Sequence, residues 1–241
     1  MNNKYTYDDI VKAYLTITVV MVNKDRDKIR IERCLRSLSE QEVPCKVILV
    51  DYGSSKDNLI WEREVVKEFP NVTLIEVKRN TKIFNKSRAL NIGFKVATTK
   101  FVLSTDIDCI FAPNFIKEVQ KALVSKPKSI VLSQKIDLDK DGTELGKHEP
   151  SASGSCIGIE LDWIEKVHGY DEVYTYWGRE DNDLVDRAIA DGYEVIWITD
   201  KTKIYHQWHL PATQKTLKDN DWYYKIPNKP IIRNPNGWGE L

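Results

Sequence analysis

The sequence predicts an α/β protein whose mostly parallel central sheet is flanked by helices on both faces. Short apolar runs rich in Val and Ile recur through the first half of the chain, and a helical pattern follows most of them. Strands that alternate with helices favour parallel pairing. The runs are continuous rather than alternating between apolar and polar residues, which is typical of strands that are buried on both faces.

The first run, LTITVVMV at 15–22, predicts a strand, and a polar loop separates it from a predicted helix over 29–41. That helix is expected because its apolar residues fall on one face, namely Ile31, Cys34, Leu35 and Leu38. The same alternation continues through the first half. It predicts strands at 46–50, 71–77, 101–105 and 129–133, and helices near 57–69, over 85–97 and from Pro113, because proline suits a first helical turn.

The chain is less regular after residue 135. Residues 137–155 form a polar segment with glycines, which is typical of a loop that folds over a site. A helix near 160–168, a helix over 180–191 and a strand at 193–198 are expected beyond it. The tail from residue 210 shows little periodicity, and no change of composition marks a boundary, so we expect one domain over 1–241.

Composition excludes several classes of function. Lys plus Arg and Asp plus Glu both number 36, so the chain lacks the basic excess that binding to nucleic acid or a membrane surface requires. The N-terminus has no basic-then-apolar signal, and no apolar stretch approaches the length that spans a bilayer. The four cysteines show no metal-binding spacing. We therefore expect a soluble cytoplasmic protein with free thiols.

Aspartates follow two of the expected strands. Asp51 closes the second strand, and Asp106 and Asp108 follow the fourth. Ligands of such sheets bind at the carboxyl ends of the strands. Side chains two residues apart on an extended segment point the same way, so Asp106 and Asp108 can share one hard divalent cation. On spacing alone, an acidic loop that caps the next helix explains the pair equally well.

Five segments in this order resemble the GT-A glycosyltransferases, most closely the inverting family 2 enzymes and the related galactosyl- and chondroitin-type transferases. The segments are VVMVNKDR, VILVDYGSS, NKSRALNIGF, FVLSTDIDCIFAPNFI and GYDEVYTYWGREDNDL, and the resemblance covers residues 15–210. It implies a GT-A, Rossmann-like fold that binds a nucleoside-diphosphate sugar, with UDP as the expected carrier. It also implies that the DxD motif, which is formed here by Asp106 and Asp108, holds Mn²⁺ or Mg²⁺.

The resemblance assigns donor-binding roles to residues of the first half. Asp51 matches an aspartate that contacts the nucleotide base or ribose, although Tyr52 stands where many relatives carry a second aspartate. Asn23 and Arg26 lie in the loop that lines the base, and ordinary loop polarity explains them nearly as well. The other donor-binding residues that the resemblance implies are Arg88, Asp106, Gly154 and Ser155. For Arg88, a solvated position on a helix is the alternative explanation.

The resemblance also implies a set of metal ligands. Asp106 resembles the carboxylate that faces ribose and metal, and Asp108 resembles the direct metal ligand. The family takes a further ligand from a histidine beyond the last strand, where this chain has IYHQWHLP at 204–211. His206 fits a chondroitin-type spacing and is preferred, whereas His209 fits a galactosyltransferase-type spacing and stays the alternative. Imidazole suits manganese and similar ions.

The segment YWGREDNDL at 176–184 resembles the family segment that meets the acceptor sugar. Asp181 is expected to take the proton from the acceptor hydroxyl, Glu180 to orient the acceptor, and Trp177 to stack on the sugar ring. Inverting transfer is a single in-line displacement, so it needs a base opposite the leaving diphosphate. An aspartate at a helix start is expected to keep a low pKa through the helix dipole. Without the resemblance, acidic capping of the helix explains Glu180 and Asp181 as well.

Together these observations predict a metal-dependent inverting glycosyltransferase that moves a sugar from a nucleoside-diphosphate sugar to a hydroxyl acceptor, expected to be a glycan. Residues 15–135 form the expected donor half, 150–210 the acceptor half and 211–241 a tail of open role. Arg179 stands where relatives often have glycine, so the acceptor pocket is expected to differ in shape or charge. Two alternatives stay open: a nucleotidyltransferase, disfavoured because the loop after the first strand has no glycine, and a binding module without turnover.

Overall fold

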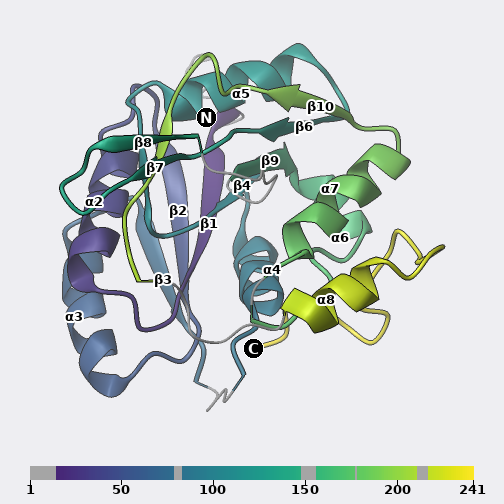
Figure 1. The fold of residues 1–241 in the computed structure, drawn as a ribbon, viewed down its shortest axis with the longest axis horizontal. Coiled ribbons are helices and arrows are strands. Elements are labelled where there is room, and N and C mark those ends of the chain that lie inside the picture. Colours follow the sequence, from purple (N-terminus) through teal and green to yellow (C-terminus); the bar gives the residue numbers. More distant parts are fainter. Residues whose placement is uncertain (1–14, 79–82, 148–155, 177, 211–216) are drawn as a thin grey trace, which may run out of the picture.

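The computed structural model of the protein describes residues 15–78, 83–147, 156–176, 178–210 and 217–241. Helices cover both faces of a large sheet, and a smaller sheet lies beside it (Figure 1). The expected α/β fold class is therefore confirmed. The strands and helices expected in the first half are all present, with ends that differ by a few residues.

Seven strands form the large sheet within these residues, in the order β10-β6-β9-β4-β1-β2-β3. They are β1 (Ile17–Asn23), β2 (Cys45–Asp51), β3 (Val72–Glu76), β4 (Phe101–Thr105), β6 (Ser129–Leu132), β9 (Cys156–Glu160) and β10 (Glu194–Trp197). β9 runs antiparallel to β4 and β6, and the other neighbouring pairs are parallel. The central strands β1 and β4 are almost entirely buried, which explains their continuous apolar runs.

Two groups of helices enclose this sheet, each with its own apolar core. α2 (Lys28–Ser39), α3 (Lys56–Lys67) and α5 (Phe115–Ser125) cover one face, and α4 (Lys86–Val96), α6 (Leu161–Lys166) and α7 (Glu180–Ala190) cover the other. The apolar positions of α2 face the sheet, as their spacing predicts: Ile31, Cys34, Leu35 and Leu38 are all buried. The two layers hold the carboxyl ends of the strands at a fixed edge.

The small sheet is absent from the sequence-based expectations. Its strands lie in the order β5 (Cys109–Phe111), β11 (Ile204–His206), β7 (Ile136–Leu138) and β8 (Glu144–Lys147). The loop expected at 137–155 is wrong as far as residue 147, because β7 and β8 pair there as an antiparallel hairpin. Residues 148–155 lie outside the described part of the chain. The strands of the small sheet have only three or four residues, and the residues of β7 are only half-buried. No continuous apolar run therefore marks these strands in the sequence.

The C-terminal segment packs against the fold. It begins with α8 (Leu217–Tyr224), and the residues after it return toward α6 and α4. The Arg233 N–H donates to the Val167 carbonyl, and the Gly239 N–H donates to the Glu172 carboxylate. Trp238 is buried in the core on the α4 side of the sheet. The described part of the tail, residues 217–241, is therefore part of the packed fold.

The four cysteines are buried and form no disulfide, as expected from their spacing. No helix in the described part of the chain combines the length and the apolar character that crossing a bilayer requires.

Candidate functional site

The carboxyl ends of β1, β2 and β4 meet at one edge of the large sheet. Asn23 ends β1 and lies opposite Asp51 at the end of β2. β4 pairs with the other side of β1 and ends at Thr105, directly before Asp106. Parallel pairing therefore brings these side chains to one edge although they are far apart in the sequence.

Asp108 and two histidines form a group with the geometry of a metal site. The ligand atoms of Asp108, His206 and His209 all lie within 4.8 Å of one another. His206 Nε2 lies 3.7 Å from Asp108 Oδ1, and His209 Nε2 lies 3.5 Å from Asp108 Oδ2. The small sheet assembles this group, because His206 of β11 pairs with Cys109 of β5, the residue directly after Asp108.

Hydrogen bonds orient both imidazole rings. His206 Nδ1 lies 2.9 Å from Asp137 Oδ1, and His209 Nδ1 lies 2.7 Å from the Leu210 carbonyl oxygen. Because these oxygens accept, Nδ1 carries a proton in each ring, and Nε2 is the ring nitrogen that faces Asp108. Burial lowers the pKa of His206, although the charge of Asp108 opposes this, so the ring is neutral at physiological pH. Two imidazole nitrogens and a carboxylate are ligands that borderline divalent ions accept.

Asp106 lies outside this group, because two lysines occupy its carboxylate. Lys135 Nζ lies 2.6 Å from Asp106 Oδ2, and Lys86 Nζ lies 3.1 Å from Oδ1. Burial raises the pKa of Asp106, but the two ammonium groups outweigh burial and hold the pKa well below its ordinary value of 3.8. The role of Asp106 as a metal ligand stays a prediction, and it requires Asp106 to exchange a lysine for the ion.

Lys86 also joins Asp106 to the acidic pair at the start of α7. Its Nζ lies 3.1 Å from Asp181 Oδ2 and 3.3 Å from Glu180 Oε1. One ammonium group thus contacts three carboxylates, and the Lys86 side chain is only 13% exposed, so these contacts are largely shielded from water. We call these four residues, Lys86, Asp106, Glu180 and Asp181, the lysine cluster. It unites two motifs that are separate in the sequence.

The acidity of Asp181 differs from the sequence-based expectation. Burial raises its pKa to about 7; Lys86 opposes this shift, and the charges of Glu180 and Asp106 add to it. The expected low pKa is wrong because the dipole of α7 acts here on a buried carboxyl that lies among other anions. A group with a pKa near neutrality can accept and release a proton at physiological pH, as general-base catalysis requires.

The chain directly before α7 is held in an unusual conformation. Arg179 has φ 72° and Tyr176 has φ 58°, in the left-handed region that residues other than glycine rarely adopt. The side-chain amide of Asn220, in α8, donates to the carbonyls of Thr175 and Gly178 at 3.0 and 2.9 Å. α8 therefore braces the segment that precedes the acidic pair.

Two of the residues predicted to contact the nucleotide, Asn23 and Asp51, are buried. Asp51 Oδ1 accepts from the backbone N–H groups of Gly53 and Ser54 at 3.1 and 3.0 Å, and Asn23 Nδ2 donates to Glu62 Oε1 at 2.9 Å. Glu62, on α3, is fully buried, and this burial together with the charge of Asp51 raises its pKa to about 8. Asp51 is 2% exposed, so its contact with a nucleotide stays a prediction.

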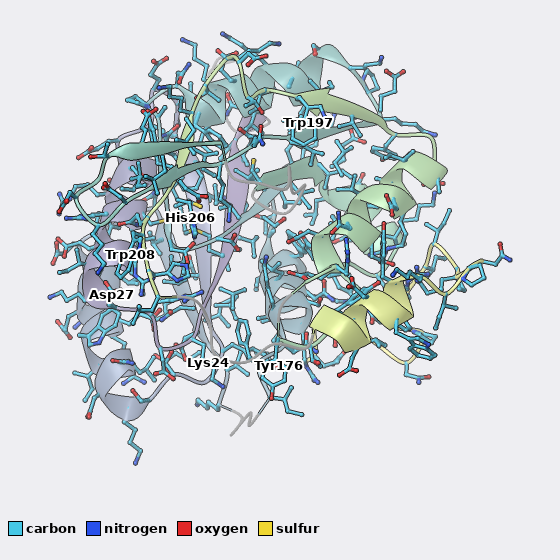
Figure 2. The ribbon with its side chains drawn as sticks, viewed as in Figure 1. Lys24, Asp27, Tyr176, Trp197, His206 and Trp208 are labelled. Carbon is cyan, nitrogen blue, oxygen red and sulfur yellow. The ribbon has the colours of Figure 1, made fainter. Side chains whose placement is uncertain are left out.

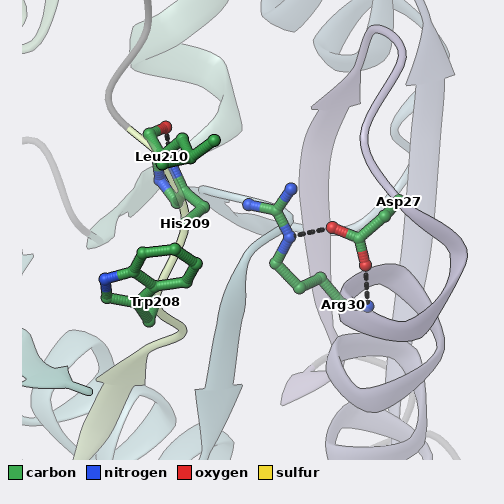
Figure 3. Close-up of a pocket in the computed structure, with 5 residues that line it drawn as sticks. All are labelled: Asp27, Arg30, Trp208, His209 and Leu210. Atoms are coloured by element: carbon green, nitrogen blue, oxygen red, sulfur yellow. Dashed lines mark hydrogen bonds and ion pairs between the residues drawn. The ribbon is translucent and has the colours of Figure 1, made fainter. Parts of the chain in front are cut away.

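A pocket of about 270 Å³ opens beside His209. It is lined by Asp27, Arg30, Trp208, His209 and Leu210. Figure 3 shows the Arg30 guanidinium pointing from α2 toward the chain at 208–210. In Figure 2, His206, Trp208 and Asp27 follow one another on the side of the molecule where α2 lies. Arg26 Nη2 lies 3.5 Å from Asp108 Oδ2, so the loop after β1 also brings a cation to the metal-type group.

The described part of the chain does not place every predicted residue at the site. Gly154, Ser155 and Trp177 lie outside the described residues. Arg88 donates twice to the Glu240 carbonyl, at 3.2 and 3.0 Å, and so binds the C-terminal segment. The cation that α4 contributes to the site is Lys86, two residues earlier.

Sequence reasoning missed Lys86, Lys135 and Glu62. Lys86 lies in the segment NKSRALNIGF, but the resemblance assigned a role only to Arg88 there, and Lys135 lies in none of the five segments. One signal did exist, because neighbouring aspartates at a strand end require nearby positive charge. Glu62 carries no comparable signal, since only the tertiary structure places it against Asn23 and Asp51.

Comparisons with known proteins agree with this geometry. A family model described as Glycosyl transferase family 2 matches residues 17–184, which is more than half of the chain. No match was found among the curated proteins.

Solved structures share the fold. TarS 1–349 from S. aureus is 16% identical, with 80% of this chain and 60% of that chain covered and a TM-score of 0.63. The mannosyltransferase PcManGT from Pyrobaculum calidifontis, in complex with GDP-Man and Mn²⁺, is 20% identical, with 82% and 57% covered and a TM-score of 0.63. GalNAc-T7 with UDP, GalNAc and Mn²⁺ is 15% identical, with 90% and 47% covered and a TM-score of 0.66. The chain thus spans less than two thirds of each of these proteins.

Proposed function

Because the chain belongs to glycosyl transferase family 2, we propose that it is a metal-dependent inverting glycosyltransferase. It takes a sugar from a nucleoside-diphosphate sugar and transfers it to a hydroxyl group, which we propose to be that of a glycan. PcManGT was solved with GDP-Man, TarS with UDP-GlcNAc and GalNAc-T7 with UDP, so we propose UDP as the first carrier to test and GDP as the second.

One observation carries this proposal. The Asp181 carboxyl, with a pKa of about 7, belongs to the lysine cluster, in which Lys86 joins it to Asp106. The group of Asp108, His206 and His209 begins two residues further along the chain. A proton acceptor and a set of metal ligands therefore share one edge of the sheet, as a displacement between an acceptor hydroxyl and a diphosphate requires.

The Asp108 group fits a divalent ion. Asp108 Oδ1 is buried and has no hydrogen-bond partner among the described residues, and both histidines present Nε2. We propose Asp108, His206 and His209 as the ligands, so that both alternative histidines take part, and Asp137 as the residue that orients His206. The imidazoles favour Mn²⁺ over Mg²⁺. A bound ion would stabilise the negative charge of the departing diphosphate.

The surrounding cations support donor binding. Arg26 and Lys135 lie against Asp108 and Asp106, and their positive charge lowers the cost of bringing a diphosphate close to these carboxylates. Asn23 and Asp51 hold the loops at the ends of β1 and β2, next to which we propose that the nucleotide binds. Residues 15–135 are then the donor half of a single domain.

On the acceptor side, Asp181 accepts the proton of the attacking hydroxyl while the new glycosidic bond forms and the diphosphate leaves. Glu180 accepts from the Gly178 N–H at 2.8 Å and contacts Lys86, so it shapes the segment that orients the acceptor. Trp177 keeps its proposed role as a platform for the sugar ring. Residues 150–210 form the acceptor half, and the tail at 211–241 supports it through α8. A cytoplasmic location stays a prediction.

The test is a survey of UDP- and GDP-sugars with the wild-type protein and Mn²⁺, with and without glycan acceptors. We expect release of the nucleoside diphosphate from at least one donor, and we expect chelation of the metal to abolish it. Pyrophosphate release from a nucleoside triphosphate would instead favour a nucleotidyltransferase. Tight donor binding without release would favour a binding module.

The metal ligands have a separate test. Mn²⁺ together with UDP should raise the Tm of the wild type, because a ligand of the native state stabilises it. Asp108→Ala should lose this rise, whereas Asp162→Ala, at an exposed position of α6, should keep it. If Asp108→Ala responds like the wild type, the metal site is assigned wrongly.

A further inference from the structure

Among the described residues, Tyr170 is the largest fully buried side chain, and its hydroxyl contacts Asp181. Tyr170 Oη donates to Asp181 Oδ1 at 3.1 Å, while Lys86 Nζ binds the other oxygen, Oδ2, at 3.1 Å. Each carboxylate oxygen therefore has its own donor. Two donors on opposite oxygens fix the plane of a carboxylate, whereas one donor leaves it free to rotate.

The Tyr170 hydroxyl also lies 2.8 Å from Ser104 Oγ. A phenol has one hydroxyl proton, and an ionised carboxylate can only accept, so Tyr170 gives that proton to Asp181. Ser104 must then donate to Tyr170. The hydrogen bonds run in one direction, from Ser104 through Tyr170 to Asp181, and in such a chain each bond strengthens the next. Ser104 lies in β4, two residues before Asp106. The two hydrogen bonds therefore link the end of this strand to the start of α7.

The structure holds Tyr170 rigidly. Asn91, on α4, accepts from the Tyr170 N–H at 2.7 Å and donates to the Tyr170 carbonyl at 2.8 Å. Asn234 donates to the same carbonyl at 2.7 Å, and the ring stacks on Phe94 with 6.1 Å between centroids. Gly169 permits this packing, because a Cβ there would lie 2.1 Å from Asn91 Oδ1. A side chain fixed at its backbone and its ring can hold a partner carboxylate in one orientation.

We propose that Tyr170 is a positioning residue whose hydroxyl, itself held by Ser104, fixes the Asp181 carboxylate in the orientation that receives the acceptor proton. The inference rests on the proposed function, because that function makes Asp181 the base. Tyr170 is fully buried, so it acts through Asp181 and does not touch the substrate.

The charges around Asp181 determine how loss of the Tyr170 hydroxyl changes the pKa of Asp181. Lys86 faces Asp181 from α4, Glu180 from α7 and Asp106 from the end of β4. Burial and the charge of Asp181 raise the pKa of Tyr170 well above its ordinary value, so Tyr170 stays a donor at physiological pH. A hydroxyl that donates to a carboxylate favours the ionised form, so its removal raises the pKa of Asp181 further.

The experiment uses Tyr170→Phe, which keeps the ring and removes only the hydroxyl. With a donor and acceptor found in the survey, we expect kcat to fall about tenfold or more with little change in KM, because the lost contact is to the base and not to the substrate. We expect the acid limb of the pH–rate profile to move to higher pH by about one unit.

A second readout needs no substrate. Carbon-13 NMR of protein labelled at the aspartate carboxyls reports the pKa of Asp181 directly, and Asp181→Asn identifies the resonance. Tyr170→Phe should raise this pKa by about one unit. Ser104→Ala should shift it in the same direction by less, because it weakens the chain while leaving Tyr170 in place.

Tyr174→Phe is the matched control. Tyr174 is also buried, and its hydroxyl lies 3.4 Å from Asp183, a different carboxylate of α7. We expect it to leave kcat and the Asp181 titration unchanged. Equal effects of the two tyrosine variants would overturn the inference, as would an unchanged Asp181 titration in folded Tyr170→Phe.

These outcomes separate the inference from the proposed function. If the wild type acts on no donor, the proposed function fails, while the NMR titration still decides whether the Tyr170 hydroxyl controls Asp181. If Tyr170→Phe does not fold, Ser104→Ala decides, and an unshifted Asp181 resonance in that variant overturns the inference.

Discussion

Two clusters of buried charge share helix α7, and they are built differently. The lysine cluster lies at its first turn. Further along, Asp171, Asp183, Arg187 and Arg233 form a second group, which we call the arginine cluster. Arg233 lies 3.0 Å from both aspartates, and Arg187 Nε lies 2.8 Å from Asp183 Oδ2.

Charge is balanced in the arginine cluster and unbalanced in the lysine cluster. Two guanidinium groups meet two carboxylates in the former, and Arg187 also donates to the Gly169 carbonyl at 2.8 Å. In the latter, three carboxylates surround Lys86, and Lys135 adds a second positive charge at Asp106. Burial, together with this surplus of negative charge, raises the pKa of Asp181 to about 7. A balanced cluster fixes the fold, whereas an unbalanced one leaves a carboxyl able to exchange a proton, as functional sites do.

The largest effect on stability is expected from Asp183→Asn. It removes the carboxylate that both arginines share, and none of the three side chains is more than 7% exposed. Loss of one partner in a buried ion pair lowers the free energy of unfolding by about 3–5 kcal/mol. Urea denaturation measures this change. Asp186→Asn, at an exposed position of the same helix, should cost no more than about 1 kcal/mol, and equal costs would mean that the arginine cluster does not stabilise the fold.

Asp181→Asn should instead affect turnover. We expect kcat to fall by about 100-fold or more, which is the scale of losing a general base, while donor binding is nearly unchanged. Steady-state kinetics and donor titration measure the two quantities. Unchanged turnover would remove Asp181 from the mechanism.

The same variant has an opposite signature in stability. The Asp181 carboxyl has a pKa of about 7 in the folded protein and an ordinary value of 3.8. As the pH rises between these values, the unfolded chain releases its proton while the folded protein keeps it, so the wild type loses stability relative to Asp181→Asn. Denaturation across this pH range should therefore show that the unfolding free energy of Asp181→Asn rises relative to that of the wild type. Asp183→Asn, in contrast, should have a lower unfolding free energy than the wild type.

The smallest effect at low pH is expected from Glu62→Gln, which tests a buried carboxyl that accepts from the Asn23 amide and lies against the Asp51 carboxylate. Burial, with the charge of Asp51, raises the pKa of Glu62 from 4.5 to about 8, so glutamine imitates its protonated form. At low pH the variant and the wild type should differ by no more than about 1 kcal/mol in unfolding free energy. As the pH rises toward 8, the wild type should lose stability relative to the variant, because only its unfolded chain releases the proton. A constant difference across this range would show that Glu62 is ionised in the folded protein.

Most of the large sheet could be predicted from the sequence because strands that are buried on both faces read as continuous apolar runs. The exception is β9, for which no strand was expected. LTITVVMV and FVLST mark β1 and β4 without any further knowledge. The small sheet could not be predicted in this way. β5, β7 and β11 have three residues each, and long-range pairing rather than local pattern creates them.

The candidate site was predictable where a motif carried it. Asp108, His206, Glu180 and Asp181 were singled out by their segments, and the structure brings them to one edge. Lys86 and Lys135 were missed because a lysine leaves no pattern in a sequence that is rich in charge. The high pKa of Asp181 was missed for a related reason, since it depends on burial and on three charged neighbours that only the tertiary structure assembles.

The docking of the C-terminal segment has a practical consequence for fragments of this protein. The family match ends at residue 184, and a minimal version trimmed to that limit would retain Asp181. It would lack His206 and His209, the Asn220 brace, the ion pairs of Arg233 with Asp171 and Asp183, and the buried Trp238. Such a shortened protein is expected to be inactive or insoluble even if the full chain is an active enzyme, so the ends of an expressed fragment are better chosen from the packing than from the family match.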